Sequence, residues 1–324
     1  MSSQRIRLGG PADILEMVPY LVGFYPAEAV VALLIRSGTV MLTMRVDMPP
    51  PDEAANLSAM ITWVSDQHGA EELVVIGYSS DAEPARQVLA TVAAELESGG
   101  LKDVLLVDGQ RWWSLMCTGG CCPENGRPYD PGSSSVAAEA VYAGLSVLAD
   151  RRALERQVSG PPGGDHNDLR LLAEQQSAEI DQLDVSARSD LIRALVESGV
   201  AQSESVDDAT CARMAALTAD VVVRDVALAL ITRDQAEKHL RLWARVVSRT
   251  TAPLEAAPLC LLGFCAWVCG NGALMNCCIE RVTAIDPDYS LARLLDKISK
   301  WAIPPSVWDE LSGEIGREVP LVTR

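Results

Sequence analysis

Aromatic residues are scarce in this sequence. They make up 5% of the 324 residues, and only two of them are phenylalanine. Hydrophobic residues still account for 48% of the chain, so a core must be built mainly from Leu, Val, Ala and Ile. With 22% charged residues, the composition is typical of a globular protein, and the length is sufficient for two domains.

Positive charge is also in short supply. Lys and Arg number 27 against 44 Asp and Glu, which gives a formal net charge of −17 at pH 7. No basic cluster occurs along the sequence, whereas proteins that bind nucleic acid place Lys and Arg against phosphates. We therefore expect no nucleic-acid partner, and the same acidity argues against binding to anionic membranes.

Targeting and membrane-spanning patterns are missing too. The first seven residues are polar and lack the cationic and then apolar pattern of a secretory signal. The nearest candidate for a membrane span, residues 17–35, is interrupted by Pro19, Gly23, Pro26 and Glu28. Because nine cysteines occur without such a signal, we expect a reducing, cytoplasmic location and mostly free thiols.

Familiar catalytic motifs are absent from the sequence. It contains no Walker loop and no GxGxxG, GxSxG, HExxH or EF-hand spacing. Its histidines, His68, His166 and His239, are too isolated to nominate a catalytic triad. We therefore expect no cofactor and favour a protein that is not an enzyme, while the enzyme alternative stays open.

The first half of the chain alternates short apolar strands with amphipathic helices. Ser37-Gly38 separates two strand patterns, 29–36 and 39–47, and predicts a β-hairpin. Further strands are predicted at 72–78, 102–108 and 111–117, and helices at 11–17, from Asp52 and from Asp81, with an apolar bend over 18–26. This order predicts an α/β domain with a mixed sheet flanked by helices. A ligand crevice is expected at strand carboxyl ends, around 77–80 and 108–109.

The second half of the chain predicts helices alone. A long helix is expected over 133–158, capped by Ser134 or Ser135, and the Gly- and Pro-rich residues 159–167 are typical of a linker. Helices are then predicted at 168–183, 186–198, 207–218, 219–231, 233–249, 255–270, 272–285 and 288–300. Thr232 and Gln235 fit a capping box. The predicted domains are therefore an α/β domain over 1–158 and an all-α domain over 168–324.

Residues 117–131, the cysteine loop, hold the densest cluster of distinctive side chains. Cys117, Cys121 and Cys122 can be metal ligands. A zinc site usually has two pairs of ligands, however, and one pair is missing here. A catalytic thiol would need a neighbouring base or positive charge, which Arg111 or Arg127 can supply only in part. We favour the structural alternative, in which the thiols pack the loop onto the domain.

The rest of the cysteine loop is rigid and presents polar groups. Loops held on a scaffold carry function more often than other segments. The alternative is that an ion pair of Arg127 with Asp130 or Glu124 merely locks the loop. The predicted ligand or partner residues, including those of the preceding strand, are Asp108, Arg111, Trp112, Trp113, Glu124, Arg127, Tyr129 and Asp130.

A second cysteine group lies within an apolar helical hairpin. Cys260, Cys265, Cys269, Cys277 and Cys278 fall among Leu, Ala, Trp and Val, which favours core packing over a metal or redox site. Residues 267–292, with a glycine turn and an Asp-Pro-x-Tyr break, are similar to one tetratricopeptide-type hairpin. One unit does not make an array, but it indicates a helical surface for a protein partner.

Three stretches together resemble an actinobacterial family described only as a domain of unknown function. They are residues 12–26, the Cys121-Cys122-Pro123 and Gly126-Arg127-Pro128 elements, and residues 261–264 through 286–292. The resemblance covers essentially the whole chain and implies an actinobacterial or actinobacteriophage origin in a cytoplasmic setting. It implies no activity.

Three hypotheses follow for the function. The first is a regulatory or adaptor protein that binds a protein partner. The second is a small-molecule- or nucleotide-binding enzyme, hydrolase-like, with a site among Asp108, Arg111, Cys121, Arg127 and Asp130. The third is a metal-binding module at Cys117, Cys121 and Cys122. The oligomeric state is left open by the sequence.

Overall fold

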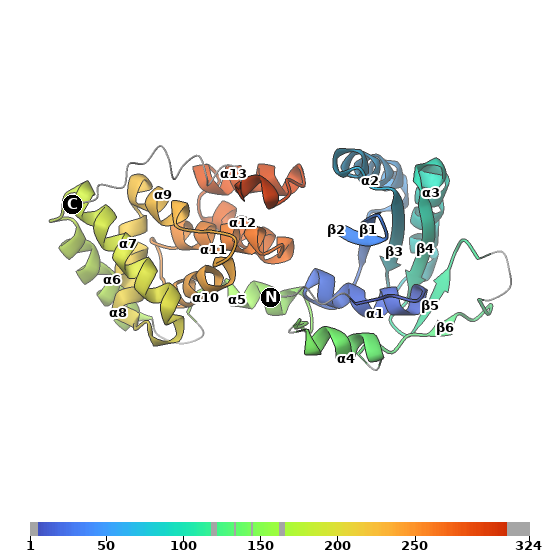
Figure 1. Ribbon diagram of the computed structural model, residues 1–324, viewed down its shortest axis with the longest axis horizontal. Helices are drawn as coiled ribbons and strands as arrows, with labels where there is room; N and C mark the ends of the chain where they lie inside the picture. Colours follow the sequence, from blue (N-terminus) through green and yellow to red (C-terminus); the bar gives the residue numbers. More distant parts are fainter. Residues whose placement is uncertain (1–5, 118–121, 133, 144, 162–165, 310–324) are drawn as a thin grey trace. The chain divides into compact units, whose positions relative to one another are not determined.

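A computed structural model of the chain describes residues 6–117, 122–132, 134–143, 145–161 and 166–309. The chain divides into two compact units, residues 1–151 and 152–324. The first is built on a mixed sheet with helices and the second is helical, which confirms the predicted fold class (Figure 1). The predicted linker over 159–167 lies partly outside the described residues, and its role as the domain boundary stays a prediction.

The first unit holds one six-stranded sheet in the order β2-β1-β3-β4-β5-β6. Only β3 and β4 run parallel, since α3 carries the chain back between them, and the other pairs are antiparallel. The elements are α1 (Pro11–Val22), β1 (Ala29–Arg36), β2 (Thr39–Asp47), α2 (Ala54–His68), β3 (Glu72–Tyr78), α3 (Ala82–Leu96), β4 (Leu101–Val107), β5 (Arg111–Ser114), β6 (Arg127–Pro128) and α4 (Ser135–Tyr142).

Helices cover both faces of this sheet. In Figure 1, α2 and α3 lie on one side of the strands, and α1 and α4 lie on the other. Gly77 of β3 faces α3 so closely that an added Cβ would lie 2.7 Å from Leu89 Cδ1. Met17 of α1 packs with Val136 and Ala140 of α4. Because two helical layers bury the central strands, β1 and β3 read as almost continuous apolar runs.

Helix α1 is longer than the predicted segment 11–17. It continues to Val22 with Pro19 inside, so the predicted apolar bend over 18–26 is helical for its first half. The helix ends at Gly23, which adopts φ 92° and donates its N–H to the Pro19 carbonyl at 2.8 Å. Burial of Leu15, Val18 and Val22 offsets the hydrogen bond that Pro19 removes.

The predicted continuous helix over 133–158 is wrong. Its start is as expected, because the Ser134 side chain caps α4 by accepting from the Ala137 N–H at 3.2 Å. The helix stops at Tyr142, however, and α5 begins only at Arg151. Between them Leu148 forms two main-chain hydrogen bonds, with Gly23 at 2.9 Å and Tyr25 at 3.2 Å. This pairing requires an extended backbone, which a helix cannot supply.

The described residues of the second unit form helices joined by turns, with no strand among them. Aspartate or asparagine caps explain where several of its helices begin: Asp184, Asp207, Asp220 and Asn271 each accept a first-turn N–H. The helices are α5 (Arg151–Gln157), α6 (Asn167–Ile180), α7 (Val185–Ala201), α8 (Asp208–Thr218), α9 (Val221–Ala229), α10 (Ala236–Val247), α11 (Ala256–Val268), α12 (Gly272–Ile285) and α13 (Ser290–Lys300).

One predicted cap is wrong. The expected capping box would start a helix at Thr232, but α10 starts four residues later, with Gln235 as its N-cap and no side-chain cap bond. Thr232 instead belongs to a turn, in which its carbonyl accepts the Gln235 N–H at 3.2 Å. The spacing of residue types was correct for a capping box, but the main-chain hydrogen bonds of the turn take precedence.

Helix α11 is the centre of the second unit. It is apolar on all sides, and every residue from Ala257 to Val268 is buried, as expected for a helix surrounded by others. It packs on α10, α12 and α13, and the predicted hairpin is α11 and α12 joined by the turn at Gly270. Four thiols of the second cysteine group, Cys260, Cys265, Cys277 and Cys278, are buried in this core.

Burial keeps three of these core thiols protonated. It raises the pKa of Cys260 to about 12 and the pKa of Cys265 and Cys278 well above the ordinary value. A thiol in this state is neither a good nucleophile nor a ready metal ligand, so packing explains Cys260, Cys265 and Cys278, and Cys277 is buried in the same core. None of the helices in the described ranges is long and apolar enough to cross a membrane.

His239 of α10 predicts a pH dependence of stability. Its side chain is 3% exposed, its Nδ1 atom has no hydrogen-bond partner among the described residues, and burial lowers its pKa from 6.5 to about 4. Between these two values the unfolded chain binds more protons than the folded chain. The contribution of neutral His239 is therefore complete above about pH 6.5 and is lost as the pH falls toward 4, by up to about 3 kcal/mol.

The measurement is the free energy of unfolding in urea between pH 7 and 4. In His239→Leu the part of the slope that belongs to this residue should disappear, with little loss of stability at pH 7, because an unpaired buried nitrogen is removed. His166→Gln, a half-buried position at the start of α6, serves as the control and should keep the slope. Equal slopes in the parent and in His239→Leu would contradict the prediction.

Candidate functional site

The two tryptophans of β5 point to opposite faces of the sheet, because side chains alternate along a strand. Trp112 lies in a cross-strand row with Val107 and Arg127, on the face that α1 covers. The Arg127 guanidinium carbon lies 5.7 Å from the Trp112 ring centroid. Trp113 faces α3, where Arg86 lies 5.0 Å from its ring. Each indole thus carries one cation at stacking distance.

An open cleft of about 430 Å³ lies on the Trp112 side of the sheet. Ligand sites for small molecules commonly have volumes of roughly 300–1,000 Å³. The cleft is bounded by the start of α1, by three residues of β4 and β5 and by two residues of the cysteine loop. Its lining residues are Gly9, Gly10, Pro11, Ala12, Asp13, Asp103, Trp112, Ser114, Cys122 and Arg127.

Charges of both signs line this cleft. The amino terminus of α1 contributes first-turn N–H groups and the positive end of the helix dipole, and Arg127 contributes a full positive charge. Asp13 accepts the Gly9 N–H at 2.6 Å. Asp103 accepts the Ser114 hydroxyl at 2.6 Å and the Val104 N–H at 2.9 Å. Both carboxylates are thus held in place by one oxygen each.

A cluster of phenols lies beside the cleft, under the next turn of α1. Glu16 accepts the Gly132 N–H at 2.9 Å, and its negative charge raises the pKa of Tyr25, Tyr78 and Tyr129. Burial is the larger cause in all three cases. The Tyr78 hydroxyl is buried and has no hydrogen-bond partner at bonding distance within the described residues. These phenols remain protonated donors across the physiological pH range.

Four of the predicted site residues hold the cysteine loop rather than line the cleft. Asp108 closes the β4–β5 turn, since its Oδ1 accepts the N–H groups of Gln110 at 2.9 Å and Arg111 at 2.7 Å. Arg111 donates to the carbonyls of Asn125 and, at 3.4 Å, Gly126. The Trp113 indole N–H donates to the Glu124 carbonyl at 3.2 Å. These bonds fix the segment that places Arg127 over Trp112.

The other predicted residues divide between the cleft and its surroundings. Trp112 and Arg127 line the cleft, Tyr129 belongs to the phenol cluster, and the Asp130 side chain is exposed. Arg127 also begins β6, a two-residue strand that was predicted as part of a loop.

The cysteine-loop thiols are only partly described. Cys117 and Cys122 are half-buried thiols outside any disulfide, and Cys122 lines the cleft. Cys121 lies outside the described residues. Across the described residues, no group of three or more His, Cys, Asp or Glu side chains is placed to hold a metal ion. Because Cys121 is not included, the metal-binding module stays a prediction.

The predicted crevice at the carboxyl end of β3 is filled by Glu28. Its carboxylate accepts the Ser79 hydroxyl at 2.8 Å, and the N–H and hydroxyl of Ser80 at 2.7 Å each. The Ser80 N–H is the largest cause of the lowered Glu28 pKa. Glu28 adopts φ 43°, a conformation that costs a non-glycine residue about 1 kcal/mol or more. The cleft lies instead over β4 and β5, away from this strand end.

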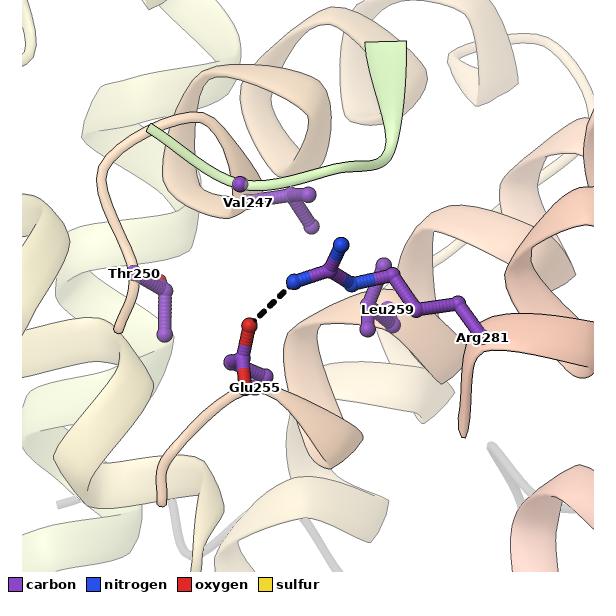
Figure 2. Close-up of a pocket in the computed structure, with 6 residues that line it drawn as sticks. Val247, Thr250, Glu255, Leu259 and Arg281 are labelled. Carbon is purple, nitrogen blue, oxygen red and sulfur yellow. Dashed lines mark hydrogen bonds and ion pairs between the residues drawn. The ribbon is translucent and has the colours of Figure 1, made fainter. Parts of the chain in front are cut away.

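A hollow in the second unit is closed to ligands. Figure 2 shows the Arg281 side chain reaching across it to Glu255, and Arg281 Nη2 donates to Glu255 Oε1. The space lined by Val247, Thr250 and Leu259 has no room even for a water molecule. This hollow is a packed ion pair rather than a binding site.

Asp13, Asp103 and Ser114 are among the cleft residues that sequence reasoning missed. Asp103 is the one carboxylate in β4, whose other residues are apolar apart from Lys102, and this is a detectable signal. Strand alternation would also have placed Ser114 and Trp112 on one face. The contribution of Asp13 and of phenols from three distant segments depends on how α1 crosses the sheet, and no local pattern carries that information.

Comparisons with known proteins give one match. A family model described as "Domain of unknown function (DUF4192)" matches residues 11–306. No curated protein and no solved structure matches the chain.

Gly126 provides a test of how the cysteine loop is held. It adopts φ 69°, and an added Cβ would lie 2.5 Å from Trp113 Cε2. Gly126→Ala should therefore lose stability both from backbone strain and from displacement of the indole. Gly109→Ala is the matched control, because Gly109 also has a positive φ, 95°, but no atom lies within 4 Å of the added Cβ.

Urea unfolding should show a loss for Gly126→Ala that exceeds the loss for Gly109→Ala by about 1–3 kcal/mol. Near-ultraviolet circular dichroism should change only for Gly126→Ala, because only that substitution moves a tryptophan. Losses of equal size would mean that the contact with Trp113 does not hold the loop.

Proposed function

We propose that the first unit binds a small polar molecule in the cleft beside Trp112 and Arg127. The chain belongs to the DUF4192 family of unknown function, so this proposal rests on the geometry of the chain itself. The observation that carries this proposal is the cleft itself, whose volume suits a small molecule and whose lining combines an aromatic wall with a few convergent polar groups.

The charges of the cleft indicate the chemistry of its ligand. Arg127 and the amino terminus of α1 favour a carboxylate or phosphate. Asp103 and Ser114 favour hydroxyl or amino groups at the other part of the ligand, because Asp103 retains an oxygen that accepts no bond in the described residues. A molecule with an acidic group and hydrogen-bond donors, such as an amino acid, a hydroxy acid or a nucleotide, has this chemistry.

Binding without catalysis suits the cleft better than a reaction does. Both carboxylates are tied to neighbouring donors, and His68, His166 and His239 do not line the cleft. General acid–base catalysis needs a group within reach of a transferred proton. We therefore propose a regulatory protein that binds a ligand, and a hydrolase-like enzyme is the weaker alternative.

The test compares two arginines that stack on neighbouring tryptophans from opposite faces. A panel of amino acids, hydroxy acids and nucleotides is screened by thermal unfolding, and each compound that stabilises the chain is titrated by calorimetry. Arg127→Gln should weaken binding by about tenfold or more, since an ionic hydrogen bond contributes roughly 1.5–3 kcal/mol. Arg86→Gln, on the far face of β5, should leave the affinity unchanged. Equal effects of the two substitutions, or no stabilising compound, would contradict the proposal.

A protein partner for the second unit is the second candidate function. In a chain of net charge −17, α13 carries Arg293, Lys297 and Lys300 against Asp296. Beside these cations, Leu294 is 49% exposed and Trp301, directly after the helix, is 59% exposed. Large apolar side chains rimmed by charge are typical of interaction surfaces. An amphipathic, acidic helix has the chemistry to bind this face, which supports an adaptor role.

Replacement of these two apolar side chains tests the adaptor role. The full chain, carrying an affinity tag, is recovered from its host, and bound proteins are quantified by mass spectrometry. Leu294→Glu combined with Trp301→Glu should remove the partner, whereas Trp63→Glu, at a residue of α2 that is 42% exposed, should retain it. Recovery of the parent chain without any partner would count against an adaptor.

A further inference from the structure

The two edges of the six-stranded sheet differ in their protection. One edge is β6, which has two residues, one of them Pro128, and so offers almost no main-chain donors. The other edge is β2, which has nine residues, contains no proline and pairs only with β1. In an edge strand, alternate N–H and C=O groups face outward and need partners.

The outward main-chain groups of β2 receive no hydrogen bond from any other segment within the described residues. Every side chain from Val40 to Val46 is half-buried, with apolar Leu42, Met44 and Val46 on one face. Arg45 is the single charge inside the strand, and its Nη1 lies 2.5 Å from Asp47 Oδ1. Native sheets usually protect an edge with unpaired charge, proline or a covering element; β2 has only a bulge near its beginning, where the pairing with β1 skips Met41.

We propose that β2 pairs with β2 of a second copy of this chain, antiparallel and about a two-fold axis at Met44. The regular part of the strand, Leu42 to Val46, is then paired over its whole length. Leu42 faces Val46 of the second copy, Thr43 faces Arg45, and Met44 faces Met44. An isologous interface of this kind requires a self-complementary strand, and this register places no like charges opposite each other.

The distribution of charge favours binding of a second copy at β2 over binding at other surfaces of the chain. The chain as a whole carries −17, so two copies repel each other over most of their surface. Thr39–Asp47 contains one Arg and one Asp and is neutral. A two-fold axis at Arg45 would place that residue opposite itself, and an axis at Thr43 would extend the pairing into the bulge at Met41. Met44 is the centre that avoids both.

Thr43 allows a test by charge, because in this register it faces Arg45 of the second copy. The oligomeric state of the full chain is measured by sedimentation equilibrium over a range of concentrations. The parent should form dimers. Thr43→Lys should weaken the dimer by roughly tenfold, since two symmetry-related like-charge contacts form, whereas Thr43→Glu should retain or strengthen it. Thr43→Gln is the control for size, and circular dichroism verifies that each variant is folded.

Cysteine cross-linking tests the register independently. Two Met44→Cys chains should form a disulfide between their introduced cysteines under mild oxidation, because these two residues face each other in the dimer. Thr43→Cys alone should not, but a mixture of Thr43→Cys and Arg45→Cys chains should cross-link, as identified by peptide mass spectrometry. A monomeric parent at all concentrations would overturn the proposal. Equal weakening by Thr43→Lys and Thr43→Glu, or a dimer that neither substitution affects, would overturn it as well.

Discussion

The alternation of side chains along β5 is the constraint on which the first unit depends. Because consecutive strand residues face opposite ways, Trp112 and Trp113 are committed to different layers of the molecule. Trp113 supports the cysteine loop from the α3 side, through its bond to the Glu124 carbonyl and its contact with Gly126. Trp112 forms a wall of the cleft on the α1 side. A shift of one residue in β5 would exchange these roles and dismantle both.

Much of the architecture could be predicted from the sequence, because local patterns determine it. The hairpin of β1 and β2, the buried strands β3 and β4 and the helical second unit follow from the periodicity of apolar residues. The break between α4 and α5 could not, since it depends on Leu148 pairing with Gly23 and Tyr25, residues more than a hundred positions away. The helix that runs through Pro19 was also not predicted in full. Tertiary burial holds this residue in a helix that its own propensity opposes.

The candidate site was less predictable than the fold. Sequence reasoning selected the lip formed by β5 and the cysteine loop, because aromatic, charged and turn residues gather there, and this segment supplies part of the cleft lining. It could not separate residues that hold the lip, such as Asp108 and Arg111, from residues that face the cleft, such as Arg127. That distinction depends on which hydrogen bonds each side chain makes. The family match confirms membership of a family of unknown function but adds no chemistry, and the actinobacterial origin and the family motifs stay predictions.

The short edge strand β6 also limits how large an assembly of this chain can become. A sheet with two open edges can add copies at both, and such addition continues without a natural end, as in fibres. Here Pro128 closes one edge, so each copy brings a single surface for strand addition. Two copies joined through β2 would consume both of those surfaces at once. The sheet would then be complete at twelve strands, twice the six of one chain, with a proline-bearing strand at either end.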